Sequence, residues 1–270
     1  MIQVNGLFDD KDHIITEQKG MFSIVEHTRD LTVSPITAME EYFMAKMDVR
    51  RKQILCTLDG SEGVTVQAGA MQWMAGNIQA TTGVKGAGDL FGKLAKGFVT
   101  KESAIKPEYV GSGYLMLEPT YKYLLLEDVS EWEGGLVLED GMYLASEGSV
   151  KLKTQARNSV SSAVLGNEGL FNLKLVGEGI AALESNVMRQ QLVEVVLNND
   201  VLKVDGNLAV CWSGSLEFTV ERSGKTLVGS AVSGEGLVNV YRGTGRVYLS
   251  TLDDSTSMYS STLTKTVKNE

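Results

Sequence analysis

The chain contains few of the residues on which common catalytic sites depend. Its 270 residues include only two histidines, His13 and His27, both near the N-terminus. A Ser-His-Asp or Cys-His site needs an imidazole, and no G-x-S-x-G segment occurs in the chain. We therefore interpret both histidines as surface or strand-end residues, and the sequence predicts no catalytic residues.

Cysteine is equally scarce. Cys56 and Cys211 lie in apolar runs and have no C-x-x-C partner, so the sequence predicts neither a disulfide framework nor a zinc site. We expect two buried free thiols, no metal and no cofactor. The N-terminal residues show no signal-peptide pattern, and no apolar run is long enough to span a membrane. A cytoplasmic location is the expectation.

Positive charge is in deficit. Lysine and arginine total 25 against 34 acidic residues, which gives a formal net charge of -9. Proteins that bind a phosphate backbone normally carry a basic face, so we expect no nucleic-acid partner. The basic run Arg50–Lys52 is interpreted as the end of a helix, where cations complement the helix dipole.

Most of the sequence shows the alternating pattern of β-strands. Leu216, Phe218 and Val220 alternate with polar residues, and so do Val150 and Leu152. A period of two with one polar face predicts half-buried antiparallel strands. Turn signals recur along the chain and are made by glycine, with 29 glycines against three prolines. We interpret the acidic segment 118–128 as an ordinary strand with solvated charges.

Glycine also reveals an internal repeat. G-x-G pairs begin at Gly111, Gly177 and Gly243, with a spacing of 66 residues each time. A second motif, an apolar strand between two turn glycines, recurs as Gly69/Gly76, Gly141/Gly148 and Gly206/Gly214. We predict about three β-units, 45–111, 112–177 and 178–252, packed around a pseudo-threefold axis. They follow an N-terminal strand and helix extension, 1–44, and precede a polar tail, 253–270.

The glycines of the pairs are expected to connect strand to strand, with positive φ or a bulge, rather than to bind phosphate. The segment 83–97 is rich in glycine and lysine, but it fails the P-loop pattern at Ala87 and Leu94. It is read as a connecting segment. A short helix starting near Asp89 would make it a candidate surface contact through Leu90, Phe91, Lys93, Leu94 and Lys96. The alternative is that these apolar residues pack on the protein's own sheet or across a subunit interface.

One helix is predicted before the repeats, over residues 37–51. Thr37 is the expected N-cap and Glu40 completes a capping box. Tyr42, Phe43, Met44 and Met47 form an apolar stripe, which we expect to pack in the core.

At "QAGAMQWMAGNIQATTGVKG", "GDLFGKLAKG" and "SGEGLVNVYRGTGRVYL" the chain resembles the altered-inheritance-of-mitochondria protein twenty-four family, over about Thr37 to Leu252. The resemblance implies an all-β fold of tandem units, sandwich- or barrel-like and similar to the tryptophan RNA-binding attenuation protein. The family has no established enzymatic activity, so the resemblance supplies no catalytic residues.

Three functions remain open. The first is a non-enzymatic, homo-oligomeric β-scaffold that binds a protein or membrane surface, and the second is a small-ligand-binding module. The third is an enzyme of unknown reaction. The repeat adds a candidate site, because Glu102, Glu168 and Glu235 each open the strand before a G-x-G pair. They would form a triangle of carboxylates around the axis, unless each accepts a hydrogen bond at its own turn.

Overall fold

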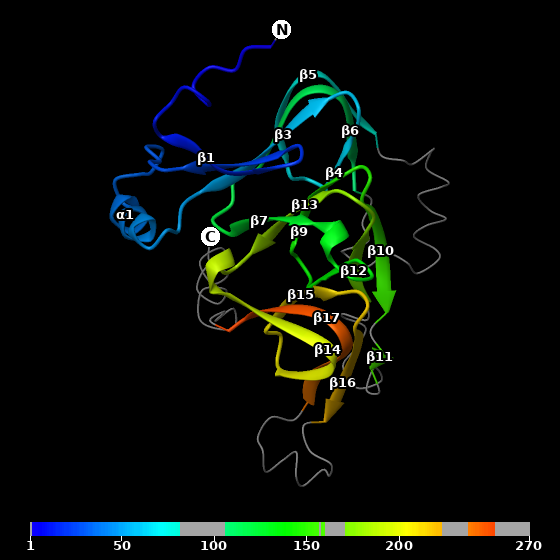
Figure 1. Cartoon of the computed structure of the whole chain (residues 1–270). Helices are drawn as coiled ribbons and strands as arrows, with labels where there is room; N and C mark the ends of the chain where they lie inside the picture. The colour runs from blue at the N-terminus through cyan, green and yellow to red at the C-terminus, as the bar shows by residue number, and fades with distance from the viewer. Residues whose placement is uncertain (1, 82–105, 157, 160–170, 223–236, 252–270) are drawn as a thin grey trace, which may run out of the picture.

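The structure is a computed structural model that describes residues 2–81, 106–156, 158–159, 171–222 and 237–251. These residues form two β-sheets, with α1 (Ala38–Lys46) as the one described α-helix and two short 3-10 turns, η2 (Val129–Glu131) and η3 (Arg189–Gln191) (Figure 1). The predicted all-β fold with one short N-terminal helix is confirmed.

The first sheet has nine strands in the order β1-β2-β3-β6-β4-β9-β13-β7, with β5 paired to β6. Their bounds are β1 His13–Lys19, β2 Phe22–His27, β3 Lys52–Asp59, β4 Val64–Val66, β5 Met71–Thr81, β6 Glu108–Leu117, β7 Tyr123–Asp128, β9 Tyr143–Glu147 and β13 Ile180–Ser185. All pairs in this sheet are antiparallel.

The second sheet has eight strands in the order β10-β12-β8-β15-β17-β16-β11, with β14 paired to β17. Their bounds are β8 Leu136–Leu138, β10 Lys151–Ala156, β11 Asn158–Ser159, β12 Phe171–Val176, β14 Leu192–Asp205, β15 Ala209–Ser213, β16 Glu217–Arg222 and β17 Leu237–Ser250. The short pair β11 and β16 is parallel, and the other pairs are antiparallel.

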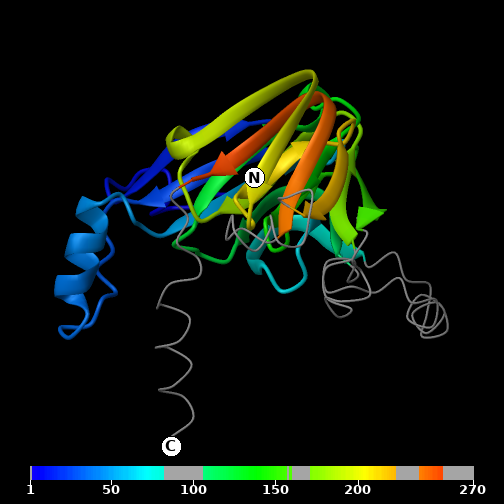
Figure 2. The ribbon, with the colours of Figure 1, turned by 90° about the horizontal axis from the view of Figure 1, so that it is seen from below.

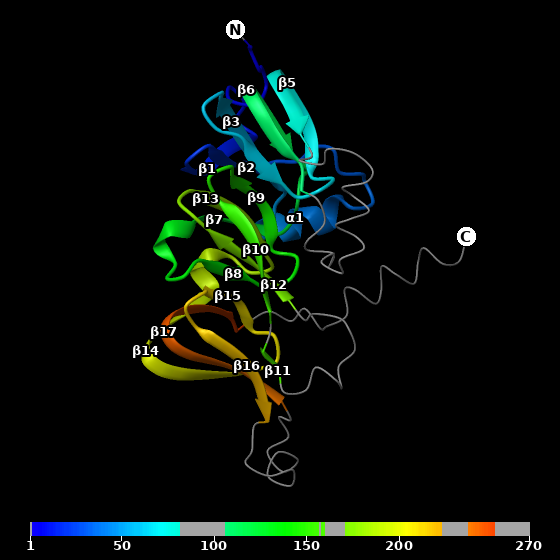
Figure 3. The same ribbon diagram turned by 90° about the vertical axis from the view of Figure 1, so that its right-hand side faces the viewer.

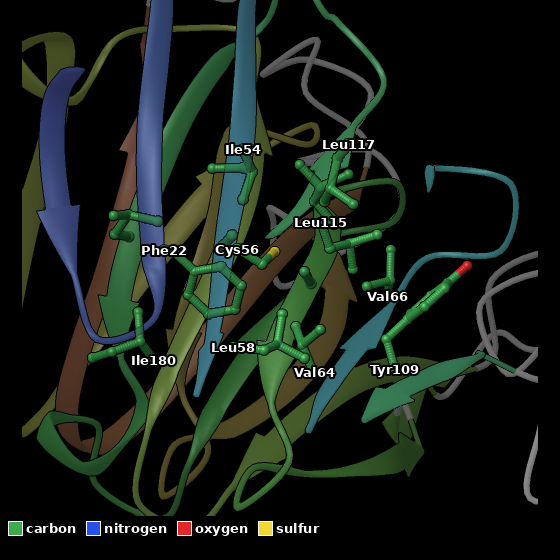
Figure 4. Packing of buried hydrophobic residues seen from close by; sticks show 14 of the residues in the cluster. Phe22, Ile54, Cys56, Leu58, Val64, Val66, Tyr109, Leu115, Leu117 and Ile180 are labelled. Carbon is green, nitrogen blue, oxygen red and sulfur yellow. The ribbon is translucent and has the colours of Figure 1, made fainter. Parts of the chain in front are cut away.

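Four apolar clusters form the core of the described part of the chain, and the smallest consists of Val25, Leu55 and Met116 on the first sheet. The first lies on the first sheet and gathers side chains such as Phe22, Ile54 and Leu115 from β2, β3 and β6 (Figure 4). The second contains residues of both sheets and so joins them, with Leu183 of β13 and Leu175 of β12 among its members. The third belongs to the second sheet, where the rings of Trp212 and Phe218 lie 5.3 and 5.1 Å from that of Tyr241. Cys56 and Cys211 are buried free thiols, as expected, and burial raises the pKa of both.

The G-x-G pairs have the predicted conformation, but two of them lie elsewhere than expected. All six glycines have positive φ, from +118° at Gly243 to +153° at Gly245. Only Gly177–Gly179 joins two strands, β12 and β13, whereas the other pairs lie inside the continuous strands β6 and β17. The expectation of a connection is therefore wrong at these two places. Gly111 shows why glycine is needed, because a Cβ there would overlap the carbonyl oxygen of Asn77 on β5.

Strand pairing is organised in the same way around each G-x-G pair. β6 pairs with β3 and β4 on one side and with β5 on the other. The strands β12 and β13 pair with β8 and β7 on one side and with β10 and β9 on the other. β17 pairs with β14 on one side and with β16 and β15 on the other. The pseudo-threefold arrangement of three units stays a prediction, and the described strands are divided between two sheets.

Candidate functional site

The two histidines meet at the open end of the N-terminal hairpin. β1 and β2 pair in antiparallel register, so His13 at the start of β1 lies opposite His27 at the end of β2. Their ring centroids are 4.7 Å apart in an edge-to-face arrangement. Both are strand-end residues, as the sequence predicts. The hairpin places the only two imidazoles of the chain side by side.

A buried glutamine fixes one of these rings. The side-chain nitrogen of Gln53 on β3 donates to the carbonyl oxygen of Leu117 and to Oε1 of Gln72, each at 2.8 Å. Its remaining oxygen lies 2.8 Å from Nε2 of His27 and must accept a hydrogen bond. Nε2 of His27 therefore carries a hydrogen. On the other ring, Nδ1 of His13 lies 3.3 Å from Oδ2 of Asp10.

Ionic contacts connect the hairpin end to α1. Arg51 places one guanidinium nitrogen 3.1 Å from Oδ2 of Asp30 and donates from Nε to the hydroxyl of Tyr121 at 2.8 Å. Tyr121 donates in turn to Oε1 of Glu41 on α1 at 2.6 Å. Hydrogen bonds from Thr32 and the charge of Arg51 lower the pKa of Asp30, so this carboxylate is ionised at neutral pH.

Two adjoining cavities lie along this network. The larger, about 360 Å³, is lined by both histidines, Gln53 and several charged residues. The smaller, about 210 Å³, runs beneath α1 and is lined partly by Ala38, Ala45 and Val49. Both are bordered by His27, Arg29, Asp30 and Arg51. We call the larger one the histidine groove. Its polar lining suits a small polar ligand.

The apolar stripe of α1 is exposed, which contradicts the expected core packing. Tyr42, Phe43 and Met47 are 58%, 60% and 75% exposed, and no residue of the helix is buried. Figure 2 shows α1 projecting from one side of the sheets. The physical reason is that no strand of the described chain lies against this side of the helix. Met39, on the same helix, is 72% exposed and extends the apolar surface.

The ends of α1 also differ from the prediction. Thr37 is the N-cap residue, but its side chain makes no hydrogen bond to the first turn of the helix and contacts Ser34 instead, so the capping box with Glu40 is absent. The helix ends at Lys46, and the basic run follows it. Arg50 still donates to the carbonyl oxygen of Ala45 at 2.7 Å, as a cation at a helix C-terminus does.

A second charged cluster lies where the sequence predicts only solvated charge. Residues 123–128 form the strand β7, as expected, but Glu127 is 3% exposed. Its carboxylate pairs with Arg189 and accepts a hydrogen bond from Nε1 of Trp132 at 3.4 Å. Burial raises the pKa of Glu127, and Arg189 opposes that shift. The strand pattern shows no sign of this burial, because Arg189 approaches from outside the sheet pairing, at η3.

The two sets of residues singled out from the sequence lie outside the described residues. These are the surface contact Leu90, Phe91, Lys93, Leu94 and Lys96, and the three carboxylates Glu102, Glu168 and Glu235. In the part of the chain that is described, no three His, Cys, Asp or Glu side chains group as metal ligands. No helix among the described residues is long and apolar enough to cross a membrane. Sequence reasoning missed the histidine groove, the exposure of the apolar stripe of α1 and the buried pair of Glu127 with Arg189.

Comparison with known proteins identifies relatives. A family model described as mitochondrial biogenesis AIM24 matches residues 46–252. An uncharacterized protein of Streptococcus pyogenes serotype M6 is 27% identical over 203 residues, which cover 73% of this chain and 79% of that protein. A crystal structure of a Streptococcus pyogenes protein superposes with a TM-score of 0.58 at 25% identity, covering 81% of this chain and 94% of that one.

Proposed function

Because the chain belongs to the mitochondrial biogenesis AIM24 family, which includes bacterial proteins, we propose that it is a non-enzymatic, self-associating β-scaffold that binds a partner protein through α1. The observation that carries this proposal is the exposed apolar surface of Met39, Tyr42, Phe43 and Met47. Exposed apolar clusters rimmed by polar residues mark contacts with other molecules. The non-enzymatic part rests on the scarcity of histidine and the lack of a catalytic motif.

Charge favours a protein over a membrane as the partner. The first turn of α1 carries Glu40 and Glu41, and the whole chain has a formal net charge of -9. Helices that lie on anionic membranes are rich in lysine and arginine on their polar face. α1 carries one basic residue in its last turn, Lys46. An apolar patch with an acidic rim suits a partner with an apolar groove bordered by basic residues.

The test replaces the aromatic side chains while keeping the helix. In Tyr42→Gln/Phe43→Gln, glutamine supports a helix and removes the exposed rings. Chemical cross-linking in a native extract should capture a partner with the wild type and lose it with this variant. The matched control is Val196→Gln on β14, where an apolar residue that is also exposed, at 71%, lies on a different element. Equal capture by all three proteins would overturn the proposal.

A membrane partner is a separate outcome of the same design. Sedimentation with anionic vesicles should leave the wild type in the supernatant. If the wild type sediments, the membrane replaces the protein as the proposed partner. Phe91→Asp then tests whether the segment 83–97 makes that contact, and the double variant of α1 tests the helix.

The histidine groove supports a small-ligand-binding module as the second candidate. Its lining combines two imidazoles, Arg51 and Asp30 around about 360 Å³, which is in the size range of small-molecule sites. A thermal-shift screen with amino acids and nucleotides tests it. A saturable shift that His27→Leu abolishes would promote this function above the scaffold. Turnover of the bound compound would favour an enzyme, which is the third alternative.

A further inference from the structure

Six strands of the described chain have one strand neighbour each, and two of them, β5 and β14, lie at opposite ends of the molecule. β5 pairs only with β6, and β14 pairs only with β17, among the residues that the structure describes. Figure 3 shows β5 at one end and β14 at the other. An unpaired strand edge is a template for pairing with another strand. The question is whether these two edges fit each other.

The chain already contains two contacts of one kind between successive predicted units, which we call joints. In each joint a short strand from one unit pairs with a strand of the next unit. The first joint is β4 with β9, and the second is β8 with β15. The residue pairs are Val64–Glu147, Thr65–Ser146 and Val66–Ala145 in the first joint, and Leu136–Ser213, Val137–Trp212 and Leu138–Cys211 in the second.

The two joints have the same register, and matching backbone hydrogen bonds flank them. Gly148 donates to the carbonyl of Gly63 at 2.9 Å, and Gly214 donates to that of Gly135 at 2.7 Å. At the other end of the joints, Gln67 donates to Leu144 at 2.8 Å and Glu139 donates to Val210 at 3.0 Å. The joint is therefore a reproducible structural element and not a chance contact.

The donor side of a third joint can be located by counting from the G-x-G pairs. Val64 lies opposite Tyr109, two residues before Gly111. Leu136 lies opposite Leu175, two residues before Gly177, and Leu202 lies opposite Tyr241, two residues before Gly243. On β14, the residues Leu202, Lys203 and Val204 thus occupy the places of β4 and β8.

The acceptor side is located in the same way. Ser146 lies opposite Ala181, two residues after Gly179, and Trp212 lies opposite Val247, two residues after Gly245. Met74 lies opposite Leu115, two residues after Gly113. A register shift occurs at the same place in all three strand pairs. It lies between Met71 and Trp73 on β5 and between Ala209 and Cys211 on β15. For β9 it lies opposite Ala182 and Leu183 of its partner β13. On β5, Trp73, Met74 and Ala75 therefore occupy the places of β9 and β15.

We propose that β14 of one chain pairs with β5 of a second copy in the register of the two internal joints. Leu202 then lies opposite Ala75, Lys203 opposite Met74, and Val204 opposite Trp73. A second copy is the occupant because the two edges lie at opposite ends of one chain and match each other's register. The contact joins different surfaces of the two copies, so it propagates head to tail into a ring or a filament. This inference rests on the proposed self-association and assigns its surface.

Burial differs between the made joints and the open edges as this pairing requires. Ser146 and Trp212 are 0% and 1% exposed where the joints are made, whereas the corresponding Met74 is 43% exposed. On the other strand, Val201 is 46% exposed and takes the place of Gly63 and Gly135. In the proposed pairing, the backbone carbonyl of Val201 accepts a hydrogen bond from the backbone N–H of Gly76 of the second copy. The carbonyls of Gly63 and Gly135 accept the corresponding bonds within the chain. Pairing two such edges covers apolar surface that one chain leaves in water.

The pair Lys203–Met74 gives the test, because residues directly opposite each other on antiparallel strands interact. Like charges at such a pair weaken it and opposite charges strengthen it. Met74→Lys places two ammonium groups together and should weaken association roughly fivefold. Met74→Glu, the matched control, should associate as tightly as the wild type or more tightly. Met74→Lys/Lys203→Glu should restore association.

Sedimentation velocity over a concentration series measures these effects, and thermal unfolding checks that each variant is folded. The wild type should form particles heavier than the 29.3 kDa chain. A 29.3 kDa wild type at every concentration overturns both the joint and self-association, and leaves partner binding by α1 to its own test. Assembly that Met74→Lys and Met74→Glu leave unchanged overturns the joint alone, because another surface then carries the assembly.

Discussion

The aromatic residues of α1 and those of the second sheet are alike in composition and opposite in environment. Trp212 and Tyr241 are each 1% exposed and pack together, whereas Tyr42 and Phe43 are 58% and 60% exposed. Both sets come from segments with a clear apolar face. The difference is that β15 and β17 are paired with strands on both edges and share a core cluster, whereas α1 has no described strand along its stripe. An apolar face in a sequence predicts that something covers it, but not that the same chain does so.

The largest expected effect comes from a substitution in the buried aromatic cluster of the second sheet. Trp212→Ala should lower the free energy of unfolding by about 3–5 kcal/mol, because it leaves a cavity among Tyr241, Phe218 and their neighbours. Phe43→Ala on the exposed helix should change it by less than about 0.5 kcal/mol. Urea denaturation of both variants measures the contrast. A loss above about 2 kcal/mol for Phe43→Ala would show that α1 is packed.

A smaller effect is expected from alanine substitutions at two glycines of the G-x-G pairs. Gly111 and Gly243 have φ of +122° and +118°, so alanine is strained at both. At Gly111 the added Cβ also overlaps the carbonyl of Asn77, whereas at Gly243 the nearest atom is 3.8 Å away. Gly243→Ala should cost about 1 kcal/mol from strain alone, and Gly111→Ala should cost about 1–2 kcal/mol more. Equal losses in thermal or urea unfolding would contradict the close approach of β5 to β6.

The pH dependence of stability separates a buried carboxylate, Glu127, from a half-buried one, Glu221. Two hydrogen bonds, from Arg242 and from Thr219, lower the pKa of Glu221 to about 2 from its ordinary 4.5. The stability that Glu221 contributes is present above pH 4.5 and is lost as the pH falls toward 2. Burial instead raises the pKa of Glu127. Its folded state binds the proton more tightly, so its contribution is present below pH 4.5 and is lost as the pH rises through the raised pKa.

Unfolding free energies measured across that pH range check both signs. Glu221→Gln should flatten the loss of stability on the acid side of pH 4.5. Glu127→Gln should flatten the decline in unfolding free energy that occurs as the pH rises above 4.5. A shallower acid loss in Glu127→Gln than in the wild type would mean that the pair with Arg189, and not burial, sets the pKa of Glu127.

Local patterns predicted the fold class and left long-range contacts undetermined. Alternation in segments such as 216–221 predicted antiparallel strands, and the G-x-G spacing predicted positive φ at six glycines. Neither pattern carries information on which strands pair, so the placement of Gly111 and Gly243 inside strands was missed. The burial of Glu127 depends on Arg189, 62 residues away. The histidine groove depends on the register of His13 with His27, which a shift between Ile15 and Glu17 sets and which the sequence pattern does not show.

The proposed head-to-tail joint is tested most directly by a covalent bond across it. Met74→Cys/Lys203→Cys places two thiols on residues predicted to lie opposite each other in neighbouring copies, where Cα atoms of antiparallel strands are within disulfide range. The native thiols Cys56 and Cys211 are buried and do not compete. Mild oxidation should give a ladder of linked chains on non-reducing gels, and Ala80→Cys/Lys203→Cys should not. A monomer band alone for the first variant, or equal ladders for both, would contradict the joint.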